Sequence, residues 1–411
     1  MKRISITGMG IISPSGIDKR KFWSNIKAGR SAVQKIERFD ASKYPSHIAG
    51  HVQELEAYSN VSSRLLKKID LFSHMALVAA ELAIEDAGID LSKGNLDRVG
   101  IFMGNAIGGW LYAETELRDL YLEGREGVSP FMASAWFPAA PQGQVSIRYG
   151  IKGYSKTFVA DRASSLMAIA YAAKNLVHDK NDFILAGGME APVTPYALLC
   201  CNTSGMLTRR NDTPETAYRP FDRNRDGFAI AEGAGILILE PPDRVEERGV
   251  KVYADIIGFG TTTDGVDRIN PAEDGFELAR AMRMALDDAG LAPDDIDYIC
   301  SDGAAKDIWD VTETKAIKNV FEHRAKKIPV SAPKSVFGNM LGASGAVDVI
   351  TTVLAMEHGM VPPTINYFDS DPDCDLDYCP NKAQYKDIKN AMVINRGRGG
   401  INCVLILQKN E

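Results

Sequence analysis

The stretch LAIEDAGIDLSKGNLDRVGIFMGNA (residues 82–106) returns later in the chain as MALDDAGLAPDDIDYICSDGAA (residues 284–305). In both copies a helix-like segment ends at Asp-Ala-Gly, an acidic loop follows, and an apolar run leads into a glycine-containing turn. Asp86 corresponds to Asp288, an offset of 288 − 86 = 202 residues, which is about half the chain. The sequence therefore predicts two related α/β halves, over residues 1–245 and 246–411. No linker-like segment divides them, so we expect one compact body.

Strand-like and helix-like runs alternate along the chain. RISITGM (3–9) and DRVGIFMG (97–104) have the apolar character of strands, whereas HMALVAAELAIEDAG (74–88) has helical periodicity and ends at a glycine. This alternation is typical of the α/β class.

Composition narrows the classes of function. The 411 residues include 45% hydrophobic residues, and 47 basic against 54 acidic residues give a net charge of −7. This balance, without a Lys/Arg run, argues against a nucleic-acid partner. We expect no membrane partner either, because no run of about 18 apolar residues occurs. The start, MKRISITGMGIISPSG, is broken by glycine and proline too early for a signal peptide, so we expect a cytoplasmic protein.

The cysteines show no pattern of a metal site or of a disulfide framework. They form no CxxC pair and have no histidine at ligand spacing, so we expect no metal and treat each as a small buried hydrophobic residue. The six are Cys200, Cys201, Cys300, Cys374, Cys379 and Cys403.

The segment FVADRASSLMAIAYAAKNLV (158–177) has the form of an active site with an unusual residue in it. The apolar start predicts a buried strand end, and small residues then lead into an alanine-rich helix. Enzymes often hold a nucleophile at such a strand-to-helix turn, where the helix N-terminus stabilises an anion. Here the side chain at the turn is Arg162, which is no nucleophile and carries the wrong charge for a helix N-terminus.

Four more loops carry small or polar residues. CSDGAAKDIWDVTETKAI (300–317), SAPKSVFGNMLGASGAVDVI (331–350) and NRGRGGINCVLIL (395–407) each join a predicted strand to a turn or a helix. The fourth contains D-x-N-x-D-G at 222–227, which resembles the start of an EF-hand. Its twelfth position is Gly233 instead of Glu, and a strand is expected to follow, so we do not expect calcium binding.

The segment RPFDRNRDGFAIAEGAGILILE (219–240) strongly resembles the signature of the β-ketoacyl synthases, the condensing enzymes of fatty-acid and polyketide assembly. Further agreement runs along nearly the whole chain, in ITGMGIISPSG (6–16), GGMEAP (187–192), PKSVFGNMLGASGAV (333–347) and HGMVPPTIN (358–366). The resemblance implies a thiolase-like fold, in which two pseudo-repeated βαβ halves form a layered αβαβα body that is usually dimeric.

The resemblance also shows which catalytic groups are missing. The family's cysteine position is occupied by Arg162, its first histidine by Asp302 and its second by Asn339, although Lys334 of the same motif is retained. The phenylalanine gate has become Arg396–Gly400. We therefore assign no catalytic residue. None of the six histidines lies in these loops; they are His47, His51, His74, His178, His323 and His358.

Within the family, ADRASSL, SDGAA and SAPKSVFGNM resemble the chain length factors, or ketosynthase β subunits, of type II polyketide synthases. This implies a non-catalytic subunit that forms a heterodimer with an active ketosynthase α and meets an acyl carrier protein. The carrier brings the phosphopantetheine, so no cofactor of its own is expected. Arg162 departs from the glutamine of that branch. We expect a salt bridge from Arg162 to Asp302, with Asp161 as another possible partner; the alternative is an Arg162 that faces solvent or a partner chain.

The matching segment for the chain-length tunnel is GNAIGGWLYAETELRDLY (104–121). Trp110, Ala113 and Leu117 lie at i, i+3 and i+7 on one helical face and match the family's gating positions, so we expect them to line the substrate tunnel. From periodicity alone they are ordinary core residues. Two other functions stay open. One is a homodimeric acyltransferase or malonyl decarboxylase that uses a group such as Lys334, and the other is a ligand-binding or structural homologue outside polyketide assembly.

Overall fold

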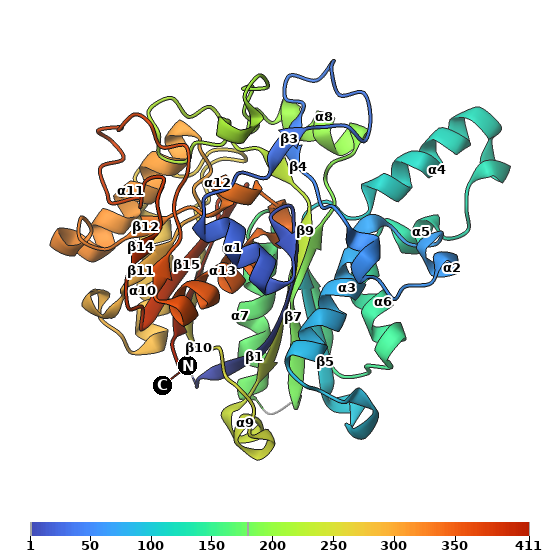
Figure 1. Ribbon diagram of the computed structural model, residues 1–411, viewed down its shortest axis with the longest axis horizontal. Coiled ribbons are helices and arrows are strands. Elements are labelled where there is room, and N and C mark those ends of the chain that lie inside the picture. The colour runs from blue at the N-terminus through green and yellow to red at the C-terminus, as the bar shows by residue number, and fades with distance from the viewer. Residues whose placement is uncertain (1, 179–180, 411) are drawn as a thin grey trace.

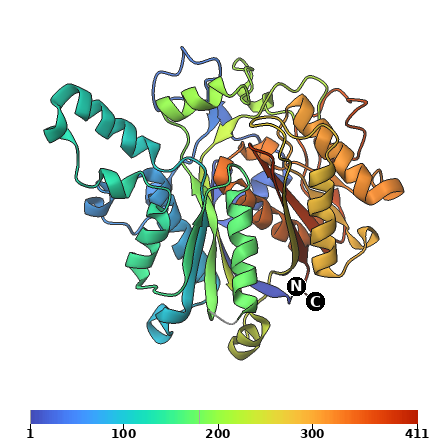
Figure 2. The same cartoon turned by 180° about the vertical axis from the view of Figure 1, so that it is seen from behind.

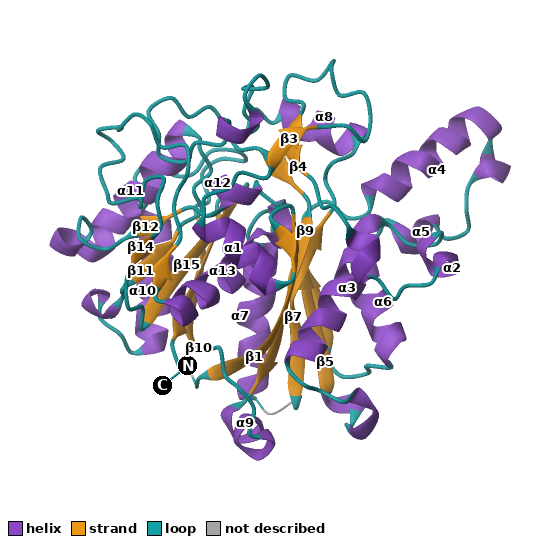
Figure 3. Ribbon diagram, in the orientation of Figure 1, coloured by secondary structure: helices purple, strands orange, loops and turns teal. Residues whose placement is uncertain are grey.

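The computed structural model describes residues 2–178 and 181–410. Its centre is a mixed sheet in the order β12-β11-β15-β16-β10-β1-β9-β7-β5-β6, with the short β2 (Gly16–Ile17) paired to β1 (Figures 1 and 3). The strands of the first half are β1 (Ile4–Ser13), β5 (Val99–Gly104), β6 (Ser155–Phe158), β7 (Phe183–Glu190) and β9 (Gly233–Glu240). Those of the second are β10 (Ala254–Thr263), β11 (Tyr298–Cys300), β12 (Val330–Ser331), β15 (Asn390–Gly397) and β16 (Ile401–Gln408).

The two halves meet where β1 and β10 pair antiparallel. Outward from this junction, each half has two antiparallel strand pairs followed by two parallel ones. In the first half the order is β1-β9-β7-β5-β6, and in the second it is β10-β16-β15-β11-β12. The strand order is thus the same in both halves, as the internal sequence repeat predicts. The thiolase-like fold expected from the sequence is confirmed.

The repeated Asp-Ala-Gly motif performs the same task twice. It ends α3 (Leu71–Asp86) in the first half and α10 (Phe276–Ala289) in the second. Asp86 accepts a hydrogen bond from the Met9 N–H at 3.0 Å, and Asp288 accepts one from the Phe259 N–H at 3.2 Å. Each aspartate therefore ties the end of an outer helix to the strand beneath it.

Helices form three layers around the strands. In the middle, α7 (Ser164–Val177) packs against α13 (Ser344–His358). On the outside, α3 and α6 (Ala140–Tyr149) cover the first half, whereas α10 and α11 (Asp307–Phe321) cover the second. Figures 1 and 2 show α3 and α7 on opposite faces of the first-half strands. This is the αβαβα arrangement.

The remaining elements lie at the ends of the strands or project from the body. An arm formed by α4 (Trp110–Glu123) and α5 (Met132–Ala135) extends away from the sheet (Figure 1). The other helices are α1 (Lys19–Lys27), α2 (Ser63–Leu66), α8 (Pro195–Thr203), α9 (Pro242–Arg248) and α12 (Lys334–Phe337). Two small sheets contain β3 (Val33–Lys35), β4 (Ile48–Gly50) and β8 (Ile230–Ala231), and β13 (Met360–Val361) and β14 (Gln384–Tyr385). Among the described residues, no helix has the length and apolarity needed to cross a membrane.

One expectation about the Arg162 segment is wrong. The apolar run at 158–160 is not a buried strand end, because β6 ends at Phe158, is the edge strand of the sheet, and leaves Val159 exposed. An apolar run alone does not distinguish a buried strand from an edge strand. The strand expected after the EF-hand-like loop is present as β8 and β9.

Two glycines show how closely helix and sheet approach. A Cβ added at Gly10 would lie 1.9 Å from the Ala79 carbonyl oxygen of α3, and one at Gly260 would lie 2.1 Å from that of Ala281 in α10. No side chain fits there unless the helix moves. These positions need glycine because of contact with the helix, in both halves alike.

We predict that Gly10→Ala lowers the free energy of unfolding by about 3 kcal/mol, because the methyl group must displace the backbone of α3. Chemical denaturation of the purified chain measures this. Gly94→Ala is the matched control, since nothing lies within 4 Å of the added Cβ at that exposed position. Equal stability of the two variants would contradict the close packing of β1 on α3.

Candidate functional site

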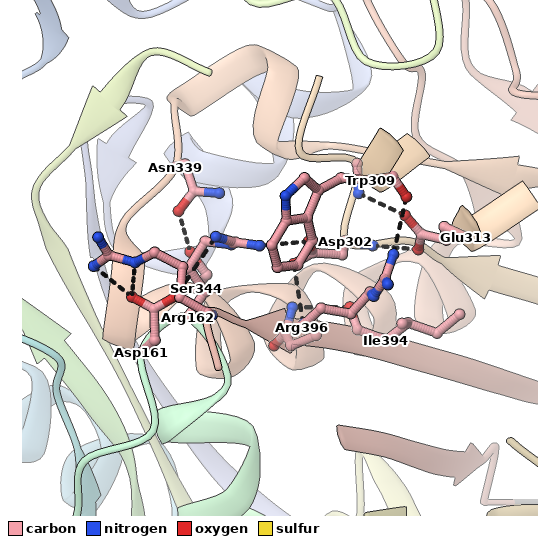
Figure 4. Close-up of polar contacts among 12 residues, drawn as sticks. Asp161, Arg162, Asp302, Trp309, Glu313, Asn339, Ser344, Ile394 and Arg396 are labelled. Carbon is pink, nitrogen blue, oxygen red and sulfur yellow. Dashed lines mark hydrogen bonds and ion pairs between the residues drawn. The ribbon is translucent and has the colours of Figure 1, made fainter. Parts of the chain in front are cut away.

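The loops singled out in the sequence meet at one end of the strands (Figure 4). The turn after β6 contributes Arg162, the turn after β11 contributes Asp302, and the segment after α12 contributes Asn339. Arg398 follows β15. The positions that the resemblance assigns to the family's catalytic groups and gate thus lie together at one site.

The turn that carries Arg162 is strained. Asp161 has a φ of 50°, a left-handed conformation that non-glycine residues rarely adopt. Ser164 supports the turn, because its hydroxyl accepts the Ala160 N–H at 2.8 Å and donates to the Asp161 carbonyl oxygen at 2.7 Å. The turn directs the next side chain, Arg162, into the protein, where only 1% of it is exposed.

Arg162 is held by two carboxylates and an aromatic ring. Its Nη2 donates to Asp302 Oδ2 at 3.3 Å, and its Nη1 lies 3.5 Å from Asp161 Oδ2. The guanidinium carbon is 4.5 Å from the centre of the Trp309 ring, within cation–π distance. The predicted Arg162–Asp302 salt bridge is therefore confirmed, with Asp161 as a second partner. The alternative in which Arg162 faces solvent is wrong.

Trp309 also lies against a second buried guanidinium, that of Arg396, at 5.0 Å (Figure 4). Arg396 donates through Nη1 to the Trp309 carbonyl oxygen at 2.9 Å and to Thr312 Oγ1 at 3.0 Å. Its backbone N–H lies 3.3 Å from Asp302 Oδ1, which accepts it. Asp302 therefore links the two arginines through its two oxygens.

Asp161 fastens the former gate to the strained turn. Its Oδ2 accepts the Arg398 N–H at 2.8 Å, and its Oδ1 accepts Arg398 Nη2 at 3.0 Å. Burial would raise the pKa of Asp161, but Arg162 and Arg398 hold that pKa below its ordinary value. Asp161 stays ionised, and the turn that begins at Arg396 is fixed in place.

Two further residues belong to the site although the sequence reasoning did not single them out. Trp309 and Glu313 lie four residues apart on α11. Glu313 accepts the N–H groups of Asp302 at 2.8 Å and Gly303 at 3.1 Å. Burial, with the charge of Asp302, raises the pKa of Glu313 to about 7. In the sequence, Trp309 and Glu313 follow the Ser-Asp-Gly turn at i and i+4, a spacing that places both on one face of a helix. This spacing is the sequence feature that could have identified them.

Asn339 and Lys334 are both fully buried and structurally engaged. Asn339 Oδ1 accepts the Leu341 N–H at 3.0 Å and the Ser344 hydroxyl at 3.3 Å. Lys334 Nζ lies 2.6 Å from Asp348 Oδ2 and donates to the Ser301 carbonyl oxygen at 3.1 Å. Burial would lower the pKa of Lys334, but Asp348 raises it overall, so the amine stays protonated.

The buried thiols are poor nucleophiles. Burial raises the pKa of Cys201, Cys300 and Cys374 to about 12, and the pKa values of Cys379 and Cys403 are raised for the same reason. Five cysteines are therefore buried as expected. The expectation is wrong for Cys200, which is exposed on α8.

The three predicted tunnel residues lie on α4 but are not equally buried. Trp110 is the first residue of the helix and is partly exposed, Ala113 is buried, and Leu117 is 38% exposed. The Trp110 ring centre lies 4.6 Å from that of Tyr196 in α8. An ordinary core stripe would be buried throughout, so only Ala113 fits that interpretation.

The buried carboxylate of Glu190, at the end of β7, joins the start of the arm to the site. It accepts the N–H groups of Ala106 at 2.6 Å and Ile107 at 3.2 Å, both just before α4. It also accepts the Gly342 N–H at 3.0 Å, in the turn that follows Asn339. Burial raises the pKa of Glu190 to about 8 in spite of these donors.

The carboxylates of the EF-hand-like loop have separate protein partners. Asp222 Oδ2 accepts the N–H groups of Phe368 and Asp369, both at 2.7 Å. Asp226 accepts the Thr208 hydroxyl at 2.7 Å. This loop therefore ties distant segments of the chain together.

We predict that Arg162→Ala lowers the free energy of unfolding by about 3–5 kcal/mol, because Asp302 is left buried and loses a charge partner. Urea denaturation measures this. The Arg162→Ala/Asp302→Ala pair should lose less than the sum of its two single variants. Arg125→Ala, at an exposed arginine, is the control and should change stability by less than about 0.5 kcal/mol. An Arg162→Ala variant as stable as this control would refute the buried ion pair.

We also predict that stability falls as the pH rises towards 8. The folded chain keeps the Glu190 proton up to about pH 8, whereas an unfolded glutamate releases it near 4.5, so rising pH favours unfolding by at most roughly 1.4 kcal/mol per pH unit. Glu313 and Asp310 have pKa values raised to about 7 and contribute to the same fall, so the share of Glu190 is the difference between the native profile and that of a Glu190 variant. Glu190→Gln should flatten the stability profile towards pH 8, and the exposed control Glu126→Gln should not. Unfolding curves at half-unit pH steps test this; identical slopes would contradict it.

Comparisons with known proteins agree on the family. The family models for the N-terminal and C-terminal domains of β-ketoacyl synthase match residues 1–244 and 253–368. A 3-oxoacyl-[acyl-carrier-protein] synthase 2 of Staphylococcus aureus (strain COL) is 39% identical over 410 residues, covering 100% of this chain and 99% of the relative. The protein of the same name from Coxiella burnetii (strain RSA 493 / Nine Mile phase I) is 36% identical over 408 residues, with 99% of each chain covered.

Two solved structures have nearly the same fold as this chain. The ishigamide ketosynthase/chain length factor has a TM-score of 0.93 at 29% identity. The AntDE:AntF complex, a type II PKS acyl-carrier protein with its ketosynthase bound to the hexaketide, has a TM-score of 0.92 at 31% identity. Both comparisons cover 100% of each chain. From its family models, its relatives and its fold, this chain belongs to the β-ketoacyl synthase family.

Proposed function

We propose that this chain is a non-catalytic chain length factor, which pairs with an active ketosynthase and shapes the tunnel that sets the length of the polyketide. The observation that carries the proposal is Arg162. A buried, doubly paired guanidinium occupies the turn where the family resemblance places a catalytic thiolate. A guanidinium cannot accept an acyl group.

The neighbouring groups support the same conclusion. Condensation in this family requires two histidines that assist decarboxylation and stabilise the enolate. At these positions Asp302 accepts hydrogen bonds from Arg162 and Arg396. The amide of Asn339 does not gain or lose a proton at ordinary pH, so it cannot act as an acid or a base. Neither residue replaces a histidine.

Among the described residues, Lys334 and the cysteines are poorly suited to act as the nucleophile. A lysine nucleophile must be neutral, whereas Asp348 keeps Lys334 protonated. The buried cysteines have raised pKa values, and the exposed Cys200 lies on α8. The paired charges at the family's catalytic positions therefore favour a structural role for this chain within a larger enzyme.

A protein partner fits the exposed apolar surface. The α4–α5 arm, the residues that flank α5 and the two ends of the edge strand β6 carry large hydrophobic side chains that water reaches in the free chain. They are Leu117, Leu120, Tyr121, Leu122, Phe131, Trp136 and Phe137, with Tyr154 just before β6 and Val159 just after it. Apolar surface of this extent is typical of a protein interface. We propose an active ketosynthase α as the partner, with an acyl carrier protein that brings the phosphopantetheine arm.

A second candidate is a homodimeric synthase-like enzyme, either an acyltransferase or a malonyl decarboxylase. The observation that favours it is the 39% identity to relatives named 3-oxoacyl-[acyl-carrier-protein] synthase 2. It requires a nucleophile or a base outside the family's usual positions.

Native mass spectrometry separates the two candidates. The protein is purified from its own cells and mixed with malonyl-loaded carrier protein. We expect a one-to-one complex with a ketosynthase, with all acyl mass on that ketosynthase and on the carrier. A homodimer of this chain that gains acyl mass itself would overturn the proposal.

A further inference from the structure

A polar pocket of about 250 Å³ lies where the turn between β1 and β2 meets the segments that flank β3 and β4, two strands that Figure 1 labels. Its wall includes Ser15 in the turn, Asn25 of α1, Arg30 and Ser31 before β3, and His51 after β4. The volume far exceeds the roughly 30 Å³ of one water molecule, and it is below the roughly 300–1,000 Å³ of sites for drug-sized ligands. A small polar molecule therefore fits this pocket better than a coenzyme does.

Two buried polar atoms in the wall have no hydrogen-bond partner among the described residues. They are Ser15 Oγ and His51 Nε2. Ser15 is only 3% exposed, so its hydroxyl is shielded from bulk solvent. Buried polar groups are almost always hydrogen-bonded, because an unpaired one is unfavourable. A ligand with hydrogen-bonding oxygens in the pocket would satisfy both atoms at once.

The charge of the pocket is positive and has no acidic partner. No carboxylate belongs to its wall, and among the described residues none forms an ion pair with Arg30. The acidic residue next to the wall in sequence, Glu54, is paired with Lys21 at 2.9 Å. A free guanidinium beside hydroxyl and imidazole groups favours an anion as the ligand.

The frame of the pocket is fixed by the main chain. The Ser15 carbonyl oxygen accepts Asn25 Nδ2 at 2.7 Å, which ties the turn to α1. The Ala32 N–H donates to the Val336 carbonyl oxygen at 2.8 Å, which ties the segment before β3 to α12. On the other side, β4 pairs with both β3 and β8. The wall is therefore held in place without a ligand.

The groups in the wall come from several segments and face the ligand from several sides. Besides Ser15, Arg30 and His51, the amides of Gln34 and Gln53 belong to the wall. A phosphoryl group has three or more strong acceptor oxygens arranged around one atom, whereas a carboxylate has two oxygens in one plane. Donors on several sides therefore suit a phosphoryl group better.

We propose that this pocket binds a phosphoryl group, either as inorganic phosphate or as the phosphate of a small ester. Arg30 is its charge partner, and Ser15 and His51 are its hydrogen-bond partners. The pocket shares no residue with the charge network around Arg162, so the inference does not depend on the proposed chain length role.

His51 makes binding at this site sensitive to pH. Burial lowers the pKa of His51, so its ring is neutral at pH 7. Of its charged neighbours, Glu232 and Glu37 raise this pKa and Arg38 lowers it, and Arg38 is paired with Glu232 through two hydrogen bonds of 2.7 Å. An anion beside the ring, together with Arg30, would favour the protonated form. Binding should therefore take up protons and become tighter as the pH falls.

Isothermal titration calorimetry tests the proposal on the full purified chain, with any subunit that co-purifies. The ligands are inorganic phosphate, glycerol 3-phosphate and acetate at constant ionic strength. We expect saturable binding of a phosphoryl ligand and much weaker binding of acetate. Arg30→Gln should weaken the affinity about tenfold, and Ser15→Ala several-fold. Arg20→Gln, at an exposed arginine of α1 outside the pocket, is the matched control and should bind as the native chain does.

The pH arm of the experiment separates a role in binding from a structural role. Between about pH 8 and pH 6 the native chain should gain affinity for the phosphoryl ligand and take up protons on binding. His51→Gln keeps a hydrogen-bonding amide that does not titrate, so it should remove this pH dependence. A His51→Gln variant with the native pH dependence would overturn the assignment of His51.

The ligands and variants give distinct outcomes. Tighter binding of inorganic phosphate identifies the free ion as the occupant, and tighter binding of glycerol 3-phosphate identifies an ester. Failure of both to bind saturably would overturn the proposal. Acetate binding as tight as that of the phosphoryl ligands would overturn the phosphoryl assignment. Equal losses in Arg30→Gln and Arg20→Gln would show that the anion binds outside this pocket.

Discussion

The site is organised around one requirement, the neutralisation of a guanidinium that is buried where a neutral or anionic nucleophile would otherwise lie. An unpaired charge at 1% exposure would cost several kcal/mol, so Arg162 requires carboxylates within reach. Asp161 and Asp302 supply them. The second oxygen of each carboxylate also needs a hydrogen-bond donor, and the segment that begins at Arg396 supplies it. Asp302 accepts the Arg396 N–H, and Asp161 accepts the Arg398 guanidinium. The substitutions in separate loops are therefore parts of one charge network.

This network explains why the strained turn persists without a nucleophile. A left-handed Asp161 costs about 1–3 kcal/mol, which an enzyme offsets because the turn exposes a reactive group. Here the same geometry points Arg162 towards Asp302 and Trp309 and leaves the Asp161 carboxylate free to receive Arg398. The turn retains its shape because the ion pairs of Arg162 and Asp161 depend on it.

The fold was predictable because its determinants are local and repeated. The helix ending at Asp86 and its counterpart at Asp288 can be read directly from the sequence, and both perform the same task in the structure. The Arg162–Asp302 pair was predictable only through the family resemblance, which aligns two loops 140 residues apart. The Asp161–Arg398 pair was not, because nothing in either segment points to a partner 237 residues away. The exposure of Val159 also escaped prediction, since an apolar run does not reveal whether its strand lies at a sheet edge.

The charge network around Arg162 is connected to the base of the α4–α5 arm. Around Arg162, two arginines contact the Trp309 ring, and Arg398 is paired with Asp161. Glu190 accepts the N–H groups of Ala106 and Gly342, so the loop that precedes α4 is tied to the turn that follows Asn339. Because Asp161 and Asp302 also bind the segment that begins at Arg396, the loops around Arg162 form one connected frame, and Glu190 extends that frame to the start of the α4–α5 arm.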